Sequence, residues 1–376
     1  MTTGMGADAG GRDVDGAAPF GVYLHVPFCR HRCDYCAFAT YTDRDHLMEA
    51  YAAACVVEVR RATEREGMPP ATSVYIGGGT PSRLPADLLA SVLGSVPVVA
   101  GAEVTVECNP EDVTPGLLAA YRTAGVTRVS LGVQSTVGHV LEGLGRRHGP
   151  THVTEAAALV AGAGLASWNM DLILGGAGER DEDWRRSLLD VLGLTPPPHV
   201  SAYALTVEPG TPLARDTDRH PDDDVQAERY ESADRILSAA GYRWEEISNW
   251  ALPGHECRHN RLYWDQGDYR GIGSSAHSHR GGRRWWNVRT PDRYVAAVAA
   301  DAPTVAGEEV LDAAGRRFEA LALALRTSTG VPTDALPDNP DLAGLVDRSD
   351  HRAVLTVRGR LLANAVTRHL VDPHVG

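Results

Sequence analysis

The sequence contains no lysine, so all 36 residues counted as Lys or Arg are arginines. This absence excludes Schiff-base chemistry on a lysine amine and the phosphate-binding lysine of P-loop proteins. Long apolar runs are also lacking, since none reaches the ~20 residues that a membrane-spanning helix needs. The first residues, MTTGMGADAGGRDVDGAAPF, are polar and do not form a secretory signal. We therefore expect a protein without a transmembrane segment.

Cysteine is scarce, with six in 376 residues, yet Cys29, Cys33 and Cys36 all stand in the stretch HVPFCRHRCDYC. Because no secretory signal precedes this stretch, we expect the chain to be cytoplasmic, where thiols stay reduced. Structural disulfides are therefore not expected. The clustered cysteines need another explanation.

The charge balance is acidic, with 49 Asp and Glu against 36 basic residues and a formal net charge of −13 at pH 7. Broad nucleic-acid binding requires a basic surface that releases counterions from phosphates. We therefore expect no nucleic acid among the partners.

Short apolar runs alternate with helical patterns over most of the chain. This alternation predicts parallel strands joined by right-handed crossovers, and six such units make an incomplete (β/α)6 barrel rather than a closed one. The predicted division is a disordered tail at 1–18, an α/β core at 19–247 and a smaller α+β domain at 248–376. The predicted strands are 21–26, 73–76, 103–107, 128–133, 168–174 and 199–205, and the predicted helices are 45–66, 85–93, 114–124, 151–163, 181–192 and 222–240.

Polar motifs stand in or directly after these runs. Cys29 follows the first run, GGGTP (77–81) follows the second, and ECNP (107–110) closes the third. Gln134 ends the fourth, while Asp171 and Tyr203 lie in the fifth and sixth. Because the carboxyl ends of parallel strands share one rim, where such barrels carry their chemistry, we expect these motifs to face one mouth.

The pattern changes after about residue 247. The segment RHNRLYWDQGDYRGIGSSAHSHRGGRRWWNV is aromatic, glycine-rich and basic, and its pair Gly281 and Gly282 predicts a hairpin turn. A helix is expected at about 313–326. The end of the chain predicts a strand, a turn at Gly359 and a last helix, as in a small wing-like module. The oligomeric state is left open between a monomer and a homodimer.

Three thiolates in the spacing C-x3-C-x2-C are suited to a metal centre. One interpretation is structural zinc, with His25 or His31 as the fourth ligand. The other is an iron–sulfur cubane, whose four irons exceed the three cysteines by one. The unligated iron would then be open to a small molecule.

The CRHRCDYC spacing, the strand-terminal GGGTP and the alternation of strands and helices resemble radical S-adenosylmethionine (SAM) proteins. That resemblance implies a [4Fe-4S] cluster on Cys29, Cys33 and Cys36, with SAM bound to the open iron. ECNP, SLGVQS, GRRH, NMDLILGGAGE and SAYALTVEPGTPL further resemble the coproporphyrinogen-oxidase-like branch over about residues 20–286. Carried over by position, the resemblance implies SAM contacts at Tyr23, Gly78, Gly79, Thr80, Glu107, Gln134, Arg146, Asp171, Ala204 and His277.

The chemistry of these residues agrees with that ligand. Glycine lets backbone N–H groups approach a carboxylate, and Arg146 binds carboxylates bidentately. Glu107 and Asp171 are suited to an ammonium group or to ribose hydroxyls. The structural interpretation of GGGTP alone is a tight turn from strand to helix.

Two departures separate the chain from the decarboxylating members of that branch. Phe38 stands where those members carry a further cysteine, and GGAGE (175–179) replaces their GLPGQ. By contrast, HNRLYW (259–264) and GIGSSAHS (271–278) resemble the HemW-type haem chaperones. That resemblance implies a cytoplasmic protein that binds haem and passes it to haem-requiring proteins.

Haem binding requires an imidazole on iron, an apolar floor for the ring and cations for the propionates. His259 or His277 is the candidate ligand, and Arg283 or Arg284 the candidate cation. Tyr263, Trp264, Trp285 and Trp286 are the candidate floor, although core or interdomain packing is the more usual role for aromatic residues near a hairpin. Cys257 is interpreted as a surface thiol, with a metal or haem thiolate as the less favoured reading.

Two other functions stay open. The first is a catalytic radical SAM enzyme, either an oxygen-independent coproporphyrinogen III oxidase or a methyltransferase, and Phe38 disfavours the oxidase. The second is tRNA modification, which the acidic charge disfavours.

Overall fold

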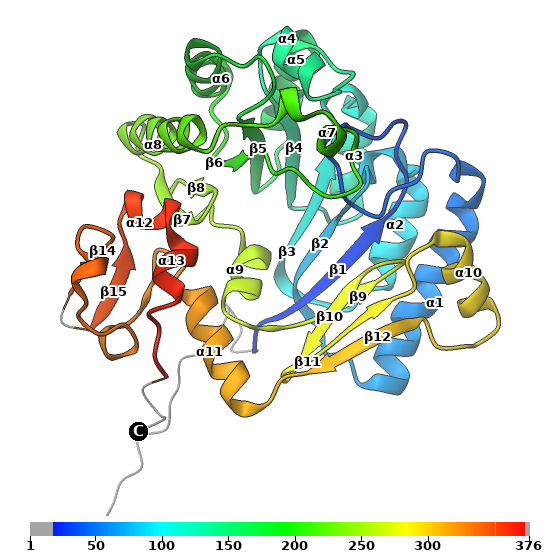
Figure 1. Ribbon diagram of the computed structural model, residues 1–376. Coiled ribbons are helices and arrows are strands. Elements are labelled where there is room, and N and C mark those ends of the chain that lie inside the picture. Colours follow the sequence, from blue (N-terminus) through cyan, green and yellow to red (C-terminus); the bar gives the residue numbers. More distant parts are fainter. Residues whose placement is uncertain (1–17, 350, 373–376) are drawn as a thin grey trace, which may run out of the picture.

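The computed structural model describes residues 18–349 and 351–372 (Figure 1). The tail predicted at 1–18 therefore lies outside the described residues, except for its last position. Within the described ranges, no helix has both the length and the apolar character needed to cross a membrane.

One sheet of twelve strands runs through the molecule, and a separate sheet of three strands lies near the C-terminus. The order in the large sheet is β12-β11-β10-β9-β1-β2-β3-β4-β5-β6-β8-β7. Its strands are β1 (Phe20–Val26), β2 (Ala71–Gly78), β3 (Val98–Cys108), β4 (Arg128–Gln134), β5 (Ser167–Leu174), β6 (His199–Ala204), β7 (Arg243–Glu246), β8 (Asn249–Ala251), β9 (Asp268–Ile272), β10 (His277–Arg280), β11 (Arg283–Asn287) and β12 (Val305–Val310), and the small sheet holds β13 (Val331–Pro332), β14 (Val346–Arg348) and β15 (Arg352–Leu355).

Helices connect the strands and cover the sheet. Thr114 accepts a hydrogen bond from the backbone N–H of Leu117 at the start of α3, and Asp222 accepts one from Val225 at the start of α8. Both are ordinary N-caps that satisfy an otherwise unpaired donor. The helices are α1 (Met48–Glu66), α2 (Ala86–Ser95), α3 (Pro115–Thr123), α4 (Gly138–Gly143), α5 (Pro150–Gly162), α6 (Asp181–Leu194), α7 (Pro212–Arg215), α8 (Asp223–Ala239), α9 (Arg258–Trp264), α10 (Pro291–Ala299), α11 (Ala313–Ala324), α12 (Val357–Leu361) and α13 (Ala363–Thr367).

The first six strands pair in parallel and in chain order, as the alternating pattern predicts. Most of their residues are buried on both faces, which is why they appear in the sequence as continuous apolar runs. The α/β class with an incomplete set of strand–helix units is confirmed. Among the described strands the sheet stays open, because β12 and β7 form its two ends.

The first strands after residue 247 extend the large sheet and do not begin a separate one. Strand β9 pairs in parallel with β1, and β10, β11 and β12 extend the same sheet by antiparallel pairing. A second hydrophobic cluster gathers residues from Leu325 onwards. The predicted division at 247 and 248 stays a prediction, but five described strands from beyond it, β8 to β12, belong to the large sheet.

The turn predicted at Gly281 and Gly282 is present. Both residues have positive φ, 59° and 88°, and they join β10 to β11. Two successive positive φ values are those of a type I′ turn, whose twist matches that of an antiparallel hairpin.

The turn predicted at Gly359 is wrong, because this residue lies inside α12. Thr356 caps that helix by accepting a hydrogen bond of 3.0 Å from the Gly359 backbone N–H. A Cβ at position 359 would lie 1.9 Å from the Leu345 carbonyl oxygen. The glycine is therefore required by close packing of the backbone, not by a turn.

Replacing Gly359 by alanine should destabilise the C-terminal hydrophobic cluster by roughly 1–3 kcal/mol, because the added methyl group overlaps backbone. The matched control is Gly94→Ala in α2, where a Cβ meets nothing within 4 Å. That control should stabilise the protein by about 0.5–1 kcal/mol, since alanine is the better helix former. Urea unfolding measures both, and equal effects of the two substitutions would contradict the packing argument.

Candidate functional site

The three clustered cysteines lie on the loop that follows β1. Backbone hydrogen bonds from Cys29 N to Tyr41 O (3.1 Å) and from Tyr41 N to Pro27 O (2.8 Å) close this loop at its base. Cys29 is buried, while Cys33 and Cys36 are partly exposed, and all six cysteines of the chain are free thiols. Burial raises the pKa of Cys29 to about 11 and also raises the pKa of Cys36.

The GGGTP segment at the end of β2 packs directly against the cysteine loop. The Gly79 backbone N–H donates to Val26 O at 2.7 Å, and the Thr80 hydroxyl lies 3.3 Å from the Cys29 sulfur. A Cβ on Gly79 would stand 2.9 Å from two carbonyl oxygens and 3.1 Å from that sulfur. Only glycine fits here, so the motif is more than a tight turn.

Arg146 reaches the loop from the segment after α4. Its Nη1 donates to the Cys33 sulfur at 3.5 Å, and its Nη2 donates to Asn109 and to the Gly132 carbonyl, each at 2.9 Å. Arg146 thus joins ECNP, β4 and the cysteine loop at one place.

Among the described residues, no three or more His, Cys, Asp or Glu side chains already surround a point where one metal ion would sit. An iron–sulfur cubane does not need such a convergence, because each thiolate binds a different iron. The loop carries three thiols next to glycine backbone and a guanidinium, and this donor set suits a cluster with one unligated iron.

Glu107 and Asp171 lie on the inner face of β3 and β5. Glu107 accepts hydrogen bonds from the Tyr75 hydroxyl (2.9 Å) and from the Gly78 backbone N–H (3.2 Å). Burial, helped by the nearby Asp171 carboxylate, raises the pKa of Glu107 to about 7. Burial likewise raises the pKa of Asp171, which accepts hydrogen bonds from Ser130 and Asn169. These partly buried carboxyl groups suit a cationic or hydroxyl-bearing ligand.

The other predicted positions fall on the same edge of the sheet. Gln134 ends β4 with a φ of 66°, a left-handed conformation uncommon outside glycine and asparagine. Ala204 ends β6 and is exposed. The structure therefore places the carboxyl-end motifs of β1 to β6 along one edge, as the parallel topology predicts.

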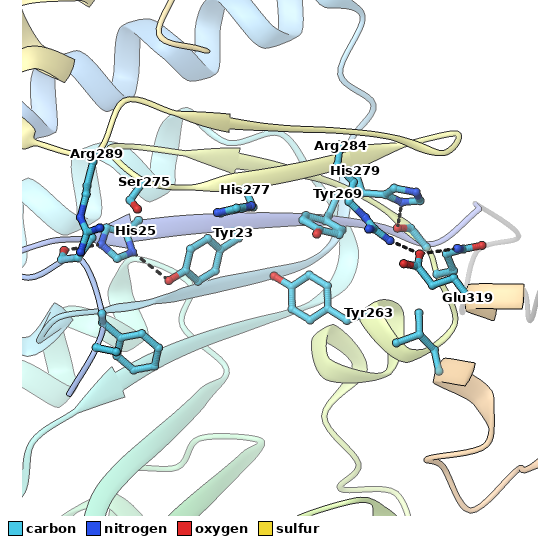
Figure 2. Close-up of a pocket in the computed structure, with 16 residues that line it drawn as sticks. Tyr23, His25, Tyr263, Tyr269, Ser275, His277, His279, Arg284, Arg289 and Glu319 are labelled. Carbon is cyan, nitrogen blue, oxygen red and sulfur yellow. Dashed lines mark hydrogen bonds and ion pairs between the residues drawn. The ribbon is translucent and has the colours of Figure 1, made fainter. Parts of the chain in front are cut away.

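A cavity of about 650 Å³ lies beside the cysteine loop, on the face of the sheet that Tyr23 and His25 share (Figure 2). Its wall combines the loop residues Ala37 and Phe38 with side chains of β1, β9, β10, α9 and α11. Ligand pockets of small molecules usually measure ~300–1,000 Å³. The cavity is therefore large enough for a cofactor.

His25 connects this cavity to the cysteine loop. Its Nε2 lies 3.0 Å from the Ala39 carbonyl, and its Nδ1 lies 3.1 Å from the Tyr23 hydroxyl. Burial lowers the pKa of His25 to about 4, so the ring is neutral near pH 7. It therefore donates from Nε2 and accepts the Tyr23 hydroxyl proton at Nδ1.

His277 lies in the middle of the cavity in Figure 2, between Tyr23 and Tyr269. Its ring stacks on Trp286 with centroids 5.6 Å apart. Desolvation lowers the pKa of His277 below its ordinary value, which favours the neutral imidazole. A neutral imidazole facing a cavity is a suitable metal ligand.

His259 of HNRLYW is fully buried in α9, and both its ring nitrogens are engaged. Nδ1 lies 2.9 Å from the Ser73 hydroxyl, and Nε2 lies 2.8 Å from the Tyr263 hydroxyl. Gly21 makes room for this packing, since a Cβ there would lie 3.1 Å from the His259 ring. In this conformation His259 packs as a core histidine, and ligation of iron would require both hydrogen bonds to break.

The candidate floor aromatics and the two candidate arginines for haem do not all lie on the same side of the sheet. Successive side chains of a strand point to opposite sides, so Arg284 lines the cavity whereas Arg283 and Trp285 line a second cavity behind the sheet. Of the four candidate floor aromatics, only Tyr263 lines the first cavity. The expectation that all four form one surface is therefore wrong.

Cys257 is buried, so its interpretation as a surface thiol is wrong as well. Its Sγ donates to Glu103 at 3.5 Å, and Glu103 also accepts the backbone N–H groups of Arg258 and His259. The start of α9 is thus held against β3 by a buried carboxylate. Burial raises the pKa of the Cys257 thiol, which disfavours a thiolate ligand.

Residues 23–191 match the family model of the Radical SAM superfamily. The haem chaperone HemW of Mycobacterium tuberculosis (strain ATCC 25618 / H37Rv) is 44% identical over 371 residues, which cover 94% of this chain and 95% of that protein. The haem chaperone HemW of Escherichia coli (strain K12) is 38% identical and covers 69% of this chain and 70% of its own length. This chain belongs to the HemW family.

A solved structure supports the same scaffold for this HemW-family chain. Coproporphyrinogen III oxidase (HemN) from Escherichia coli, described as a radical SAM enzyme, superposes with a TM-score of 0.80 at 21% identity. The match covers 93% of this chain and 89% of that one. At this identity the likeness shows the fold alone.

Some residues that line the cavity of this HemW-family chain belong to none of the sequence motifs. Arg289 and Glu319 line it from the segment after β11 and from α11, and no spacing pattern connects them to β1. The sequence motifs indicate His25 only as a zinc ligand. Its position two residues after Tyr23 was the available signal, because alternate residues of a strand share a face.

Glu107→Gln should flatten part of the pH dependence of stability. The folded pKa is raised from 4.5 to about 7, so the stabilisation by protonated Glu107 is complete below pH 4.5 and is lost as the pH rises through 7. Between pH 5 and 8 the wild type should lose on the order of 2–3 kcal/mol that the variant keeps. Urea unfolding at both pH values measures this difference, and the exposed Glu64→Gln is the control. Parallel curves for wild type and Glu107→Gln would contradict the assignment.

Proposed function

We propose that this protein is a haem chaperone that carries a [4Fe-4S] cluster and SAM and delivers haem to haem-requiring proteins. One structural observation carries the proposal. A cavity of about 650 Å³ adjoins the cysteine loop and is lined by a neutral imidazole and by two arginines, in a chain that is 44% identical to a haem chaperone over 94% of its length.

Cys29, Cys33 and Cys36 would hold the cluster, and superfamily membership supports this assignment. When bound, the cluster supplies an iron atom without a protein ligand, to which SAM attaches. Residues around the loop hold the cysteine side chains in position. Thr80 contacts the Cys29 sulfur, Arg146 contacts the Cys33 sulfur, and Gly79 lets the loop and the end of β2 approach at backbone hydrogen-bond distance.

The SAM contacts proposed from the resemblance are compatible with the geometry of the strand edge. Tyr23 and His277 line the cavity. Glu107 lies under the glycine segment and accepts the Gly78 backbone N–H. The remaining proposed contacts are Gly79, Thr80, Gln134, Arg146, Asp171 and Ala204.

For haem, His277 is the favoured iron ligand of this proposal because its ring faces the cavity and is neutral, and a His277 that ligates haem would give up its proposed SAM contact. Arg289 has no carboxylate partner among the described residues and is suited to a propionate. Arg284 is already paired with Glu309 and Glu319. His259 remains the other candidate ligand, at the cost of the two hydrogen bonds that hold it.

Membership of the HemW family also supports proposals on the location, the partners and the oligomeric state of this protein. We infer a cytoplasmic protein whose partners are haem-accepting proteins, without nucleic acid, and which is a monomer or a homodimer. Phe38 is well exposed, at 65%, on the wall of the cavity, and it is suited to contact a docked acceptor or the edge of the haem.

Replacing Cys29, Cys33 or Cys36 singly by alanine should abolish the cluster, since a cubane held by two thiolates is not retained. Anaerobic reconstitution followed by iron and acid-labile sulfide analysis measures this loss. Cys55→Ala on α1 is the matched control and should keep full cluster content. Zinc without sulfide in the wild type would contradict the cluster.

Haem titration of the reconstituted protein should give a shifted Soret band and one retained haem per chain. His277→Ala should weaken haem binding about tenfold or more and alter the Soret position, because it removes the proposed ligand. Arg289→Gln should weaken binding less and leave the Soret position unchanged, because it removes only a propionate contact.

His259→Ala distinguishes the two candidate ligands. It should lower the thermal stability, because it leaves the buried Ser73 and Tyr263 hydroxyls unpaired, while the haem spectrum of the folded protein stays that of the wild type. A wild-type spectrum in His277→Ala and an altered one in His259→Ala would reverse the assignment.

A catalytic radical SAM enzyme is the second candidate function. The observation in its favour is that all the side chains of the proposed SAM set lie along one strand edge or line the adjoining cavity. Anaerobic turnover with a reductant would then release 5′-deoxyadenosine together with a modified substrate. Phe38, at the position of the further cysteine of the decarboxylases, argues against coproporphyrinogen oxidation.

A further inference from the structure

A second cavity, of about 470 Å³, lies behind the sheet extension formed by β9, β10 and β11. It is enclosed by the C-terminal half of α1, the outer faces of these strands and the segment that leads into β12. The alternation of side chains separates the two cavities. Tyr269, His277 and Arg284 face the first cavity, while their neighbours Arg270 and Arg283 face the second.

Four arginines line this second cavity: Arg61, Arg270, Arg280 and Arg283. Arg270 is the distinctive member because it is only 6% exposed and its Nε is buried without a hydrogen-bond partner. Its Nη2 has only two distant acceptors, Glu58 at 3.5 Å and Glu66 at 3.4 Å. A buried guanidinium with unused donors is costly unless a ligand or water supplies acceptors.

The ion pairs at the cavity leave one arginine without a carboxylate partner among the described residues, because Arg280 donates to the Glu66 backbone carbonyl at 3.2 Å. Glu58 accepts from Arg270 only at 3.5 Å, while the same carboxylate accepts shorter hydrogen bonds from Tyr294 (2.6 Å), Gly273 N (2.9 Å), Asn287 (2.9 Å) and Thr304 (3.1 Å). Glu66 and Glu308 are about half exposed, at 49% and 53% of their side chains. Exposed ion pairs contribute little to stability, so an anion competes with them readily.

Trp285 fixes the positions of two of the arginines. The guanidinium carbons of Arg270 and Arg283 lie 5.4 and 4.8 Å from its ring centroid. Cation–π contact preorganises a guanidinium while leaving its in-plane N–H donors free. Arg61 is held separately by Asp301 at 2.7 Å and by the Val298 carbonyl. The wall therefore presents fixed guanidinium groups from three directions.

We propose that this second cavity binds a small polyanion through its phosphate or carboxylate groups, with Arg270, Arg280 and Arg283 as the binding residues. Planar guanidinium groups recognise both oxyanions bidentately. The site is independent of the proposed haem site, because it lies on the opposite face of the sheet and contains no histidine in its wall. Its failure would therefore leave the proposed function untouched.

Isothermal titration of the full-length, cluster-reconstituted protein with inorganic pyrophosphate and, separately, with succinate at equal ionic strength tests the proposal. We expect one-to-one binding of at least one probe. Binding of pyrophosphate alone identifies a phosphate-bearing ligand, and binding of succinate alone identifies a carboxylate-bearing one. Failure of both probes to bind at millimolar concentration would overturn the proposal.

Two variants and one control locate the binding. Arg270→Gln and Arg283→Gln should each weaken probe binding at least tenfold, and Arg283, half exposed, serves if the buried variant does not fold. Arg284→Gln, one residue further along β11 but facing the first cavity, should bind the probe as the wild type does. Equal loss in Arg283→Gln and Arg284→Gln would show nonspecific binding and refute the site. Haem titration of the same variants keeps this result separate from the haem proposal.

Discussion

The contact between Gly79 and the loop after β1 holds the candidate site together. The Gly79 backbone N–H donates to Val26 O, and the backbone N–H of the next residue, Thr80, donates to Phe28 O at 2.9 Å. These bonds continue the pairing of β1 and β2 beyond their last paired residues, Val26 and Gly78. The cysteine loop is therefore fixed to the sheet at backbone distance, and no residue with a Cβ fits at position 79.

Buried charge is the second organising feature. Glu107 and Asp171 are both raised in pKa by burial, and each is surrounded by hydrogen-bond donors rather than by a direct ion-pair partner. A carboxyl group held in this way is suited to accept from hydroxyl groups or to neutralise a cation that enters. Tyr75, which donates its hydroxyl proton to Glu107, stacks on the His259 ring with the centroids 5.4 Å apart. The helix that carries HNRLYW thus holds Tyr75, and through it Glu107, in position, although His259 itself does not face the cavity.

The extension of the sheet by β9, β10 and β11 has a cavity on each of its two faces. Each strand places alternate residues on opposite sides, so a short basic and aromatic segment lines two cavities. Adjacent residues such as Arg283 and Arg284, or Trp285 and Trp286, therefore belong to different environments. In the sequence these neighbours form one basic and aromatic patch, but the pleat of the strand turns their side chains to opposite faces of the sheet.

The sequence by itself determined the six parallel strands, their helices, the glycine turn at 281 and 282, and the expectation that strand-end motifs share one edge. These features follow from local periodicity and from the rule that parallel strands end together. Only the tertiary structure decided that β9 pairs with β1, that His259 and Cys257 are buried, and which arginines face which cavity. These outcomes depend on contacts between residues far apart in the chain, such as His259 with Ser73 and Cys257 with Glu103, and no local pattern records such contacts.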